Sequence, residues 1–555
     1  MKTRFFFVLF CFWIVVANSS NAQINRPYEP IVITGETLSD LPNLEIEHLF
    51  LFAYDAGTGT WKMIPFQIDE VNPNVEDSLK YFEAEDSLGG LFDADDELVF
   101  MASDLGDRAD SLFWASNTDT IRYELKFIDP LDNSIGYVYL YYSNSIIDPI
   151  PNYYEMTYDS VNDRVSSMNY ELGFIERGGD DPNETGQLND VIIKSGSGED
   201  IFDRLKIRAI GWWLLWRIYL DEETIEAKYA YAKIGPVRII RNMAGNFFFE
   251  TLNSVEPFTQ TVFFYPWSGS FELVDIPLGE AKEVGAQVFT VRVSWDLNSR
   301  AQGMKFYSEF NSDGFPINGR ADNIDESCKP GELNWTMVTG NQGTIVNAFH
   351  IPDLGDITRL YYFDYDSTEG VTGDDPGYFS YDTGDLTSFG DNGFSLDENI
   401  QNYIDNETVF NFYYHNYFLP PNFSSEEAAT ICEQIKNPLN YSSKFQIKYT
   451  LPAEVSESKT SPLGDFSLIQ NYPNPFNTAT TISFTLAKKT YVKLQIYDSL
   501  GRLVTTIENR IISVGSYKYL WAGQNSEGII VPSGIYLCKL TTKEFSTTKK
   551  LLLIK

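Results

Sequence analysis

Apolar and polar residues alternate along most of this chain in short runs, a pattern typical of half-buried β-strands. Gly, Asn, Asp and Pro separate the runs, and these residues favour turns. The clearest predicted strands cover residues 47–54, 97–101, 121–127, 137–142, 236–241, 261–265, 287–293 and 445–449. The pattern therefore predicts an all-β fold.

One segment, residues 424–435, has the period of an amphipathic helix instead. Ser424 precedes it as a capping residue, and Glu426 and Glu427 open its first turn, where negative charge is favoured. The sequence shows no fixed-period repeat of the kind found in propellers and solenoids. We therefore expect packed sheets with little helix.

The chain has 555 residues, more than one hydrophobic core usually serves. We expect an N-terminal β-domain at 23–148, a large β-sandwich domain at 149–454, a linker at 455–462 and a small C-terminal sandwich at 463–555. The pattern leaves open whether residues 23–454 form one large two-sheet sandwich or two sandwiches in series.

The first 22 residues have the pattern of a secretory signal peptide. Lys2 and Arg4 precede a run of twelve apolar residues at 5–16, and Ser20-Asn21-Ala22 offers a cleavage site before Gln23. A membrane anchor is the weaker interpretation, because a helix needs about 20 apolar residues to span a bilayer. No later stretch is long and apolar enough to span one either. We therefore expect export.

The C-terminal region contains several short motifs in a fixed order. They include Asn471-Tyr472-Pro473-Asn474-Pro475-Phe476-Asn477, Pro532-Ser533-Gly534-Ile535-Tyr536 and the basic and apolar end at 549–555. Residues 463–555 resemble the type A C-terminal sorting domain of type IX secretion cargo. The family's usual tryptophan-aspartate-glycine is Trp521-Ala522-Gly523 here.

The resemblance implies an immunoglobulin-like sandwich, the type IX secretion machinery as partner, and a location outside the cell or on its outer surface. It also implies that Tyr472, Pro473, Asn474, Pro475, Phe476, Asn477, Gly534 and Tyr536 belong to the sorting motif. The alternative from the residues alone is an ordinary sandwich module with no role in sorting.

Charge separates the tail from the rest of the chain. The formal net charge is -37, which disfavours binding to nucleic acid because phosphate backbones are negative. Residues 463–555 nevertheless carry eleven Lys and Arg against five Asp and Glu, whereas residues 23–462 have a net charge of -45. A basic tail on an acidic body suits a sorting signal joined to its cargo.

Common catalytic motifs are absent from the sequence. The three histidines, His48, His350 and His415, do not have zinc-hydrolase spacing, and there is no serine nucleophile elbow or phosphate-binding loop. The 73 acidic residues of the body single out no carboxylate pair for glycoside hydrolysis. Catalytic residues therefore stay unassigned, and cofactor-binding residues other than a metal site are not expected.

An acidic segment at 85–96 has some features of a calcium-binding loop. Gly90 lies at the sixth position of twelve, and carboxylates lie at the ninth and twelfth, as in an EF-hand loop. We expect Asp93 and Asp96 to be direct ligands and Asp95 an outer one. The alternative is an acidic turn before the strand at 97–101.

Aromatic residues favour a glycan-binding function. Trp212, Trp213 and Trp216, or Trp267 with Phe264 and Tyr265, would stack on sugars if exposed, although core packing is the commoner role. The leading hypothesis is an exported surface or extracellular protein that binds glycan or another envelope component. The competing hypothesis is a glycan-cleaving enzyme, either a carboxylate-dependent glycosidase or a polysaccharide lyase using groups such as Arg238, Arg241 and Tyr265.

Two further resemblances are short. Residues 64–70 with 92–100 are similar to the start of certain uncharacterised secreted β-proteins, and residues 235–238 with 335–340 are similar to galactose-mutarotase-type sandwiches. They inform the fold and not the chemistry. The sequence also leaves open whether Cys328 and Cys432 form a disulfide.

Deletion of residues 463–555 tests the sorting assignment. In a host with a type IX system we expect the truncated protein to be trapped in the periplasm, because the signal peptide still directs it across the inner membrane. Fractionation and immunoblotting measure this. Normal appearance of the truncated protein outside the cell would contradict the assignment.

Overall fold

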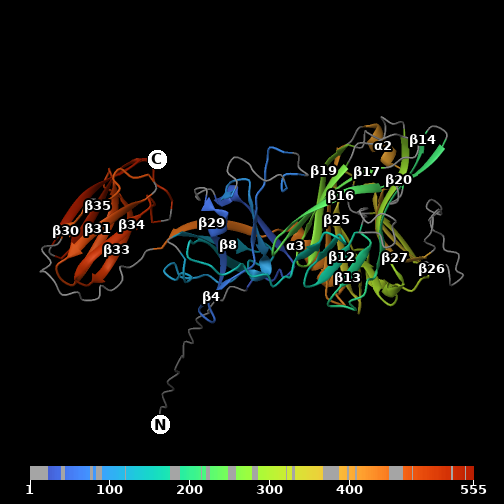
Figure 1. Ribbon diagram of the computed structural model, residues 1–555, viewed down its shortest axis with the longest axis horizontal. Helices are drawn as coiled ribbons and strands as arrows, with labels where there is room; N and C mark the ends of the chain where they lie inside the picture. The colour runs from blue at the N-terminus through green and yellow to red at the C-terminus, as the bar shows by residue number, and fades with distance from the viewer. Residues whose placement is uncertain are drawn as a thin grey trace, which may run out of the picture.

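The computed structural model consists of β-sandwiches arranged along the long axis of the molecule, with the N-terminal sandwich between the C-terminal one and the largest one (Figure 1). It describes residues 23–554 except 39–43, 76–78, 83–89, 119–120, 175–187, 214–215, 221–224, 248–257, 278–285, 321, 328–331, 355, 367–386, 397–398, 407–408, 449–466, 470, 478, 527–528 and 544. The predicted all-β class is confirmed, and the predicted signal peptide lies outside the described residues.

The first sandwich packs a three-stranded sheet against a five-stranded one. The small sheet has the order β1 (Pro30–Thr34), β7 (Glu97–Met101), β5 (Gln67–Asp69), and a two-stranded ladder joins β2 (Leu44–Glu45) to β6 (Leu91–Phe92). The large sheet has the order β29 (Asn440–Ile447), β8 (Ile121–Ile128), β9 (Ile135–Tyr142), β3 (Leu49–Asp55), β4 (Thr60–Met63).

Strand β7 is buried on both faces. Leu98 and Phe100 pack in the core of the first sandwich, whereas Val99 and Met101 pack in the core of the second. A strand covered on both sides needs a continuous apolar run instead of alternation, and Leu98–Met101 is such a run. The two cores therefore meet at this strand.

The second sandwich is larger. A nine-stranded sheet has the order β16 (Ile225–Ile234), β17 (Ile239–Phe247), β18 (Phe258–Phe264), β19 (Ser268–Pro277), β28 (Val409–Leu419), β25 (Gly343–His350), β24 (Asn334–Gly340), β21 (Lys305–Ser308), β22 (Asn311–Pro316). The facing sheet has the order β15 (Trp216–Leu220), β14 (Phe202–Trp213), β20 (Ala286–Leu297), β27 (Thr387–Leu396), β26 (Thr358–Asp366), β23 (Asp322–Ser327). A separate four-stranded sheet packs on the same core. It has the order β10 (Thr157–Asp159), β11 (Arg164–Ser166), β12 (Tyr170–Gly173), β13 (Asp190–Ile193).

Two α-helices are described, α2 (Ile400–Asp405) and α3 (Ser425–Lys436). Helix α3 confirms the predicted one: the Ser424 side chain accepts from the N–H of Glu427, whose carboxylate accepts from the Ser424 N–H. The helix packs Ala428, Ile431 and Cys432 on the outer face of the nine-stranded sheet. Cys432 has a free, buried thiol whose pKa is raised by burial, and Cys328 lies outside the described residues.

The C-terminal sandwich has two small sheets around its own core. One has the order β30 (Ser467–Leu468), β31 (Thr480–Leu486), β34 (Gly515–Trp521), and the other the order β33 (Leu503–Ile512), β32 (Thr490–Asp498), β35 (Gly534–Thr542), β36 (Ser546–Leu553). Strand β31 alternates strictly between buried and half-buried residues, the pattern of a strand with one face in a core.

The chain returns to the first sandwich before it reaches the tail. Strand β29 pairs with β8 in antiparallel register from Asn440 opposite Ile128 to Ile447 opposite Ile121. Residues 440–447 thus belong to a sheet of the first sandwich, although the expected large domain at 149–454 included them. The expected division at 148 and 149 stays a prediction, and both β7 and β29 connect the parts on either side of it.

A buried guanidinium joins the first two sandwiches. Arg238, between β16 and β17, donates from Nε to Asp69 Oδ2 at 2.9 Å and from Nη2 to Glu97 Oε2 at 2.7 Å. Its main-chain N–H donates to Gln67 Oε1 at 2.7 Å. A Cβ atom at Gly235 would lie 2.1 Å from that oxygen, so only glycine permits this approach. The segments around 64–70, 97–100 and 235–238 are therefore partners in one contact.

Substitution of Arg238 by Met tests how much this contact contributes to the stability of the fold. We expect a loss of about 3 kcal/mol in the free energy of unfolding, because Asp69 and Glu97 would keep buried charge without the guanidinium. Urea unfolding of the exported chain measures this. Arg502→Met is the control, since Arg502 pairs with Asp498 while 76% exposed and should cost at most about 1 kcal/mol. Equal losses in the two variants would contradict the role of Arg238.

Candidate functional site

Two residues of the predicted sorting motif, Asn474 and Phe476, pair with the edge of the last strand, β36. The Asn474 side chain donates to the Lys550 carbonyl at 3.1 Å and accepts from the Leu552 N–H at 2.8 Å. Phe476 continues the pairing, because its N–H donates to the Leu552 carbonyl and its carbonyl accepts from the Ile554 N–H, both at 2.9 Å. The motif thus covers a sheet edge that would otherwise be open to other strands.

The motif residues differ in exposure, and Asn474 and Gly534 are half-buried. Phe476 and Tyr536 are buried against Trp521, with ring centroids 5.6 and 5.2 Å away, and the Tyr536 hydroxyl donates to the Pro532 carbonyl. Gly534 begins β35. The exposed set consists of Tyr472, Pro473, Pro475 and Asn477. The buried set stabilises the domain, and the exposed set is available to a partner.

The three carboxylates expected to bind calcium lie in one turn before β7. Asp96 is buried, and its carboxylate accepts from the N–H of Val71 at 3.2 Å and of Asp93 at 3.0 Å. Burial raises the pKa of Asp96 to about 6. Asp93 is half-buried and accepts from the N–H of the exposed Asp95. These hydrogen bonds stabilise the turn. The calcium site stays a prediction, and the preceding residues 83–89 lie outside the described part.

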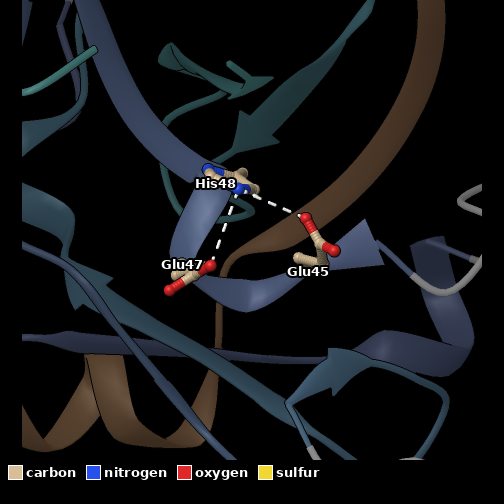
Figure 2. A group of neighbouring side chains, drawn as sticks. All are labelled: Glu45, Glu47 and His48. Atoms are coloured by element: carbon tan, nitrogen blue, oxygen red, sulfur yellow. Dashed lines mark ion pairs between the residues drawn. The ribbon is translucent and has the colours of Figure 1, made fainter. Parts of the chain in front are cut away.

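A second group of metal-ligating atoms lies on the short turn between β2 and β3. Figure 2 shows the carboxylates of Glu45 and Glu47 facing the same nitrogen of the His48 ring. Glu45 Oε2 lies 3.2 Å and Glu47 Oε1 3.6 Å from His48 Nε2. The three ligand atoms lie within 4.8 Å of one another. Zinc-site spacings do not include this local Glu-x-Glu-His arrangement, so the sequence did not reveal it.

An aromatic surface lies on the outer face of the five-stranded sheet. It consists of Tyr54, Trp61 and Phe113: the Trp61 and Phe113 rings stack at 6.2 Å and 23°, and Tyr54 lies 5.1 Å from Trp61 and 5.5 Å from Phe113. The ring of Phe113 is 43% exposed, and the other two are half-buried. Below them, Arg122 lies 5.7 Å from the Trp61 ring and 4.4 Å from that of Trp114.

Arg122 also positions the segment that carries Phe113. Its Nη1 donates to the Phe113 carbonyl at 2.8 Å, and the hydroxyls of Tyr139 and Tyr141 accept from the N–H groups of Ala109 and Ala115. These bonds tie the segment to the face of the sheet. The aromatic surface is therefore built on a rigid support.

The aromatic residues named from the sequence are placed differently. Phe264 and Tyr265 are buried in the core, and Trp267 is half-buried and packs against that core. They therefore do not form an exposed platform. The side chains of Trp212, Trp213 and Trp216 lie outside the described part of the structure.

The groups suggested for a lyase serve other roles. Arg238 pairs with Asp69 and Glu97, Arg241 donates to both carboxylate oxygens of Asp163, and the Tyr265 ring is in the core. These contacts are internal to the fold.

A different set of ionisable groups lies on the outer face of the six-stranded sheet. Lys206 Nζ is 2.6 Å from Asp296 Oδ2 and 4.0 Å from Asp391 Oδ2. Arg292 donates from Nη1 to the Tyr361 hydroxyl at 2.5 Å. All but Tyr361 are at most 2% exposed. Such a set is used either for catalysis or as an internal ion-pair network.

The family model for the secretion system C-terminal sorting domain matches residues 470–555. The sorting domain expected from the motifs is therefore confirmed. It indicates export to the cell surface or the extracellular space and interaction with the type IX secretion machinery. No helix among the described residues is both long enough and apolar enough to cross a bilayer.

Solved structures resemble the chain only distantly. A glycosyl hydrolase family 38 protein from Enterococcus faecalis has 9% identity and a TM-score of 0.36 over 91% of this chain and 57% of its own. An alpha-mannosidase from Enterococcus faecalis V583 has 8% identity and a TM-score of 0.37, over 89% of this chain and 54% of its own. PorZ of Porphyromonas gingivalis is a surface component of the type-IX secretion system. It has 10% identity and a TM-score of 0.13, over 76% of this chain and 63% of its own. The chain thus spans less than two thirds of each, and none of these similarities bears on function. No curated protein matches the chain.

The calcium prediction is tested by melting the exported chain with and without the ion. If Asp93 and Asp96 are ligands, calcium at 100 times its dissociation constant adds about 2.7 kcal/mol to the free energy of unfolding. The melting temperature of the exported chain then rises. Magnesium at equal ionic strength controls for charge screening. An Asp93→Asn, Asp96→Asn double variant that keeps the calcium-specific shift, or a chelator without effect, would favour the acidic turn alone.

Proposed function

We propose that this exported β-protein binds a glycan through its aromatic surface of Tyr54, Trp61 and Phe113. The stacked rings of Trp61 and Phe113, carried by distant parts of the sequence, are the observation that supports the proposal. Aromatic rings that are partly exposed and rigidly supported suit the apolar faces of sugar rings. The proposed binding site belongs to the first sandwich.

Polar groups lie on the same hairpin as Tyr54 and Trp61, and recognition of sugar hydroxyls requires such groups. The hairpin between β3 and β4 exposes the hydroxyls of Thr58 and Thr60 and the carboxylate of Asp55. A hydrogen bond from the Thr58 side chain holds the pKa of Asp55 below its ordinary value, so the carboxylate stays ionised. An ionised carboxylate accepts strong hydrogen bonds from hydroxyl groups.

The apolar tip of the covering segment adds to the surface. Leu112 is 72% exposed beside Phe113, and the Asp110 side chain accepts from its N–H at 2.8 Å. Leu112 and Phe113 expose apolar surface next to the aromatic rings. Exposed apolar patches commonly mark binding sites. The tip is thus held in place in a form that offers apolar surface to a ligand.

A glycan-cleaving enzyme is the second candidate function. The Arg292 to Tyr361 hydrogen bond favours it, because a lyase needs a group to move a proton and a cation beside the carboxylate of a uronate. Lys206, Asp296 and Asp391 would add further ionisable groups to the same face. Their near-complete burial, however, suits an internal network better than an open active site.

Retention of the exported chain on immobilised neutral and uronate polysaccharides tests the binding proposal. We expect Trp61→Ala and Phe113→Ala to weaken retention about five- to thirtyfold, equivalent to about 1–2 kcal/mol each. Phe310→Ala is the matched control, because Phe310 is 38% exposed on the second sandwich. Melting temperatures establish that the variants are folded.

Two other results would contradict the binding proposal. Undiminished retention of both aromatic variants would place the binding site outside the aromatic surface. New reducing ends or unsaturated products, lost in a Tyr361→Phe variant, would replace the binding proposal with the enzymatic one.

A further inference from the structure

The turn between β2 and β3 brings three potential metal ligands to one point. Glu45 ends β2, and Glu47 and His48 belong to the single 3-10 turn that leads into β3. The turn is anchored on both sides, because the N–H of Ile46 donates to the Gly90 carbonyl at 3.0 Å and the His48 carbonyl accepts from the Ser143 N–H at 2.8 Å. Its backbone is therefore fixed before any ion binds.

The imidazole of His48 is held as well. The edge of the Tyr142 ring packs against it at a centroid distance of 5.7 Å and an interplanar angle of 77°. The His48 side chain is 28% exposed, whereas those of Glu45 and Glu47 are 55% and 82% exposed. A fixed nitrogen with two adjustable carboxylates can close around an ion at little cost in ordering.

Hydrogen bonding does not account for the arrangement. Both carboxylates approach the same nitrogen, Nε2, which carries at most one hydrogen. Within the described structure the ring lies close to the carboxylates of Glu45 and Glu47 and packs against Tyr142, but it forms no hydrogen bond. Neither oxygen therefore lies along the direction in which Nε2 would donate.

Oxygens placed in this way match neighbouring ligands of one metal ion. Zinc binds nitrogen and oxygen at about 2.0–2.2 Å in tetrahedral geometry, which separates adjacent ligand atoms by about 3.3 Å. The separations of 3.2 and 3.6 Å between His48 Nε2 and the two oxygens agree with that value. The two carboxylate oxygens lie within 4.8 Å of each other.

The donor set selects the class of ion. One imidazole and two carboxylates suit zinc and similar transition metals, whereas calcium and magnesium prefer ligands that are all oxygen. Two negative charges also balance a divalent cation. We propose that Glu45, Glu47 and His48 form a binding site for a divalent transition metal ion of the zinc type, with water completing the coordination.

Zinc titration of the full exported chain tests the site, with affinity measured by competition against a chelating dye. We expect saturable binding of one equivalent that depends on His48 and is not displaced by calcium at equal ionic strength. His48→Ala and Glu47→Gln should each weaken zinc binding at least about tenfold, since each removes one of three protein ligands. Glu47 is 82% exposed, so its variant keeps the test valid if the His48 variant folds poorly.

Matched variants separate this site from others on the chain. His350→Ala should leave zinc affinity unchanged, because His350 lies on β25 of the second sandwich beside Tyr413. The Asp93→Asn, Asp96→Asn double variant should also leave it unchanged. Cobalt(II) bound in place of zinc should show visible absorption bands that shift when His48 is replaced. Equal zinc affinity in the His48→Ala, Glu47→Gln and parent chains, or displacement by calcium, would overturn the proposal.

Discussion

Pairing of the buried Arg238 guanidinium is the constraint on which the body of this protein depends. A charge that is 2% exposed must have partners of opposite sign, and these come from Asp69 on β5 and Glu97 on β7. The three segments must therefore meet in one orientation. Because β7 also contributes apolar residues to both cores, the same contact sets how the first two sandwiches pack on each other.

Local signals in the sequence predicted much of the fold. The cap at Ser424 and the apolar run that became β7 depend on neighbours in the chain, so pattern alone revealed them. The aromatic surface could not be predicted in this way, because Trp61 and Phe113 meet only after the sheet has formed. The prediction that Phe264 and Tyr265 help to form a sugar-binding platform was wrong for the same reason. Both are buried, and composition does not tell which face of a strand is covered.

The charge distribution has a structural explanation as well. Several cations of the body are buried and paired with carboxylates, namely Arg26 with Asp129, Arg238 with Asp69, Arg241 with Asp163, and Lys206 with Asp296. Exposed basic residues in the sorting domain include Lys488, Lys489, Lys493 and Arg502. Using cations internally leaves an acidic surface on the body, while the tail presents positive charge to its surroundings.

The return of β29 to the first sandwich has a consequence for the order in which the protein can fold. Arg122 on β8 donates to Gln446 on β29 across 324 positions of sequence. A pairing of such high contact order forms late, since the loop must close before the contact stabilises it. The outer edge of the five-stranded sheet therefore stays open until nearly all of the body has been synthesised. The native body is completed as a unit, immediately before the segment that leads to the sorting domain.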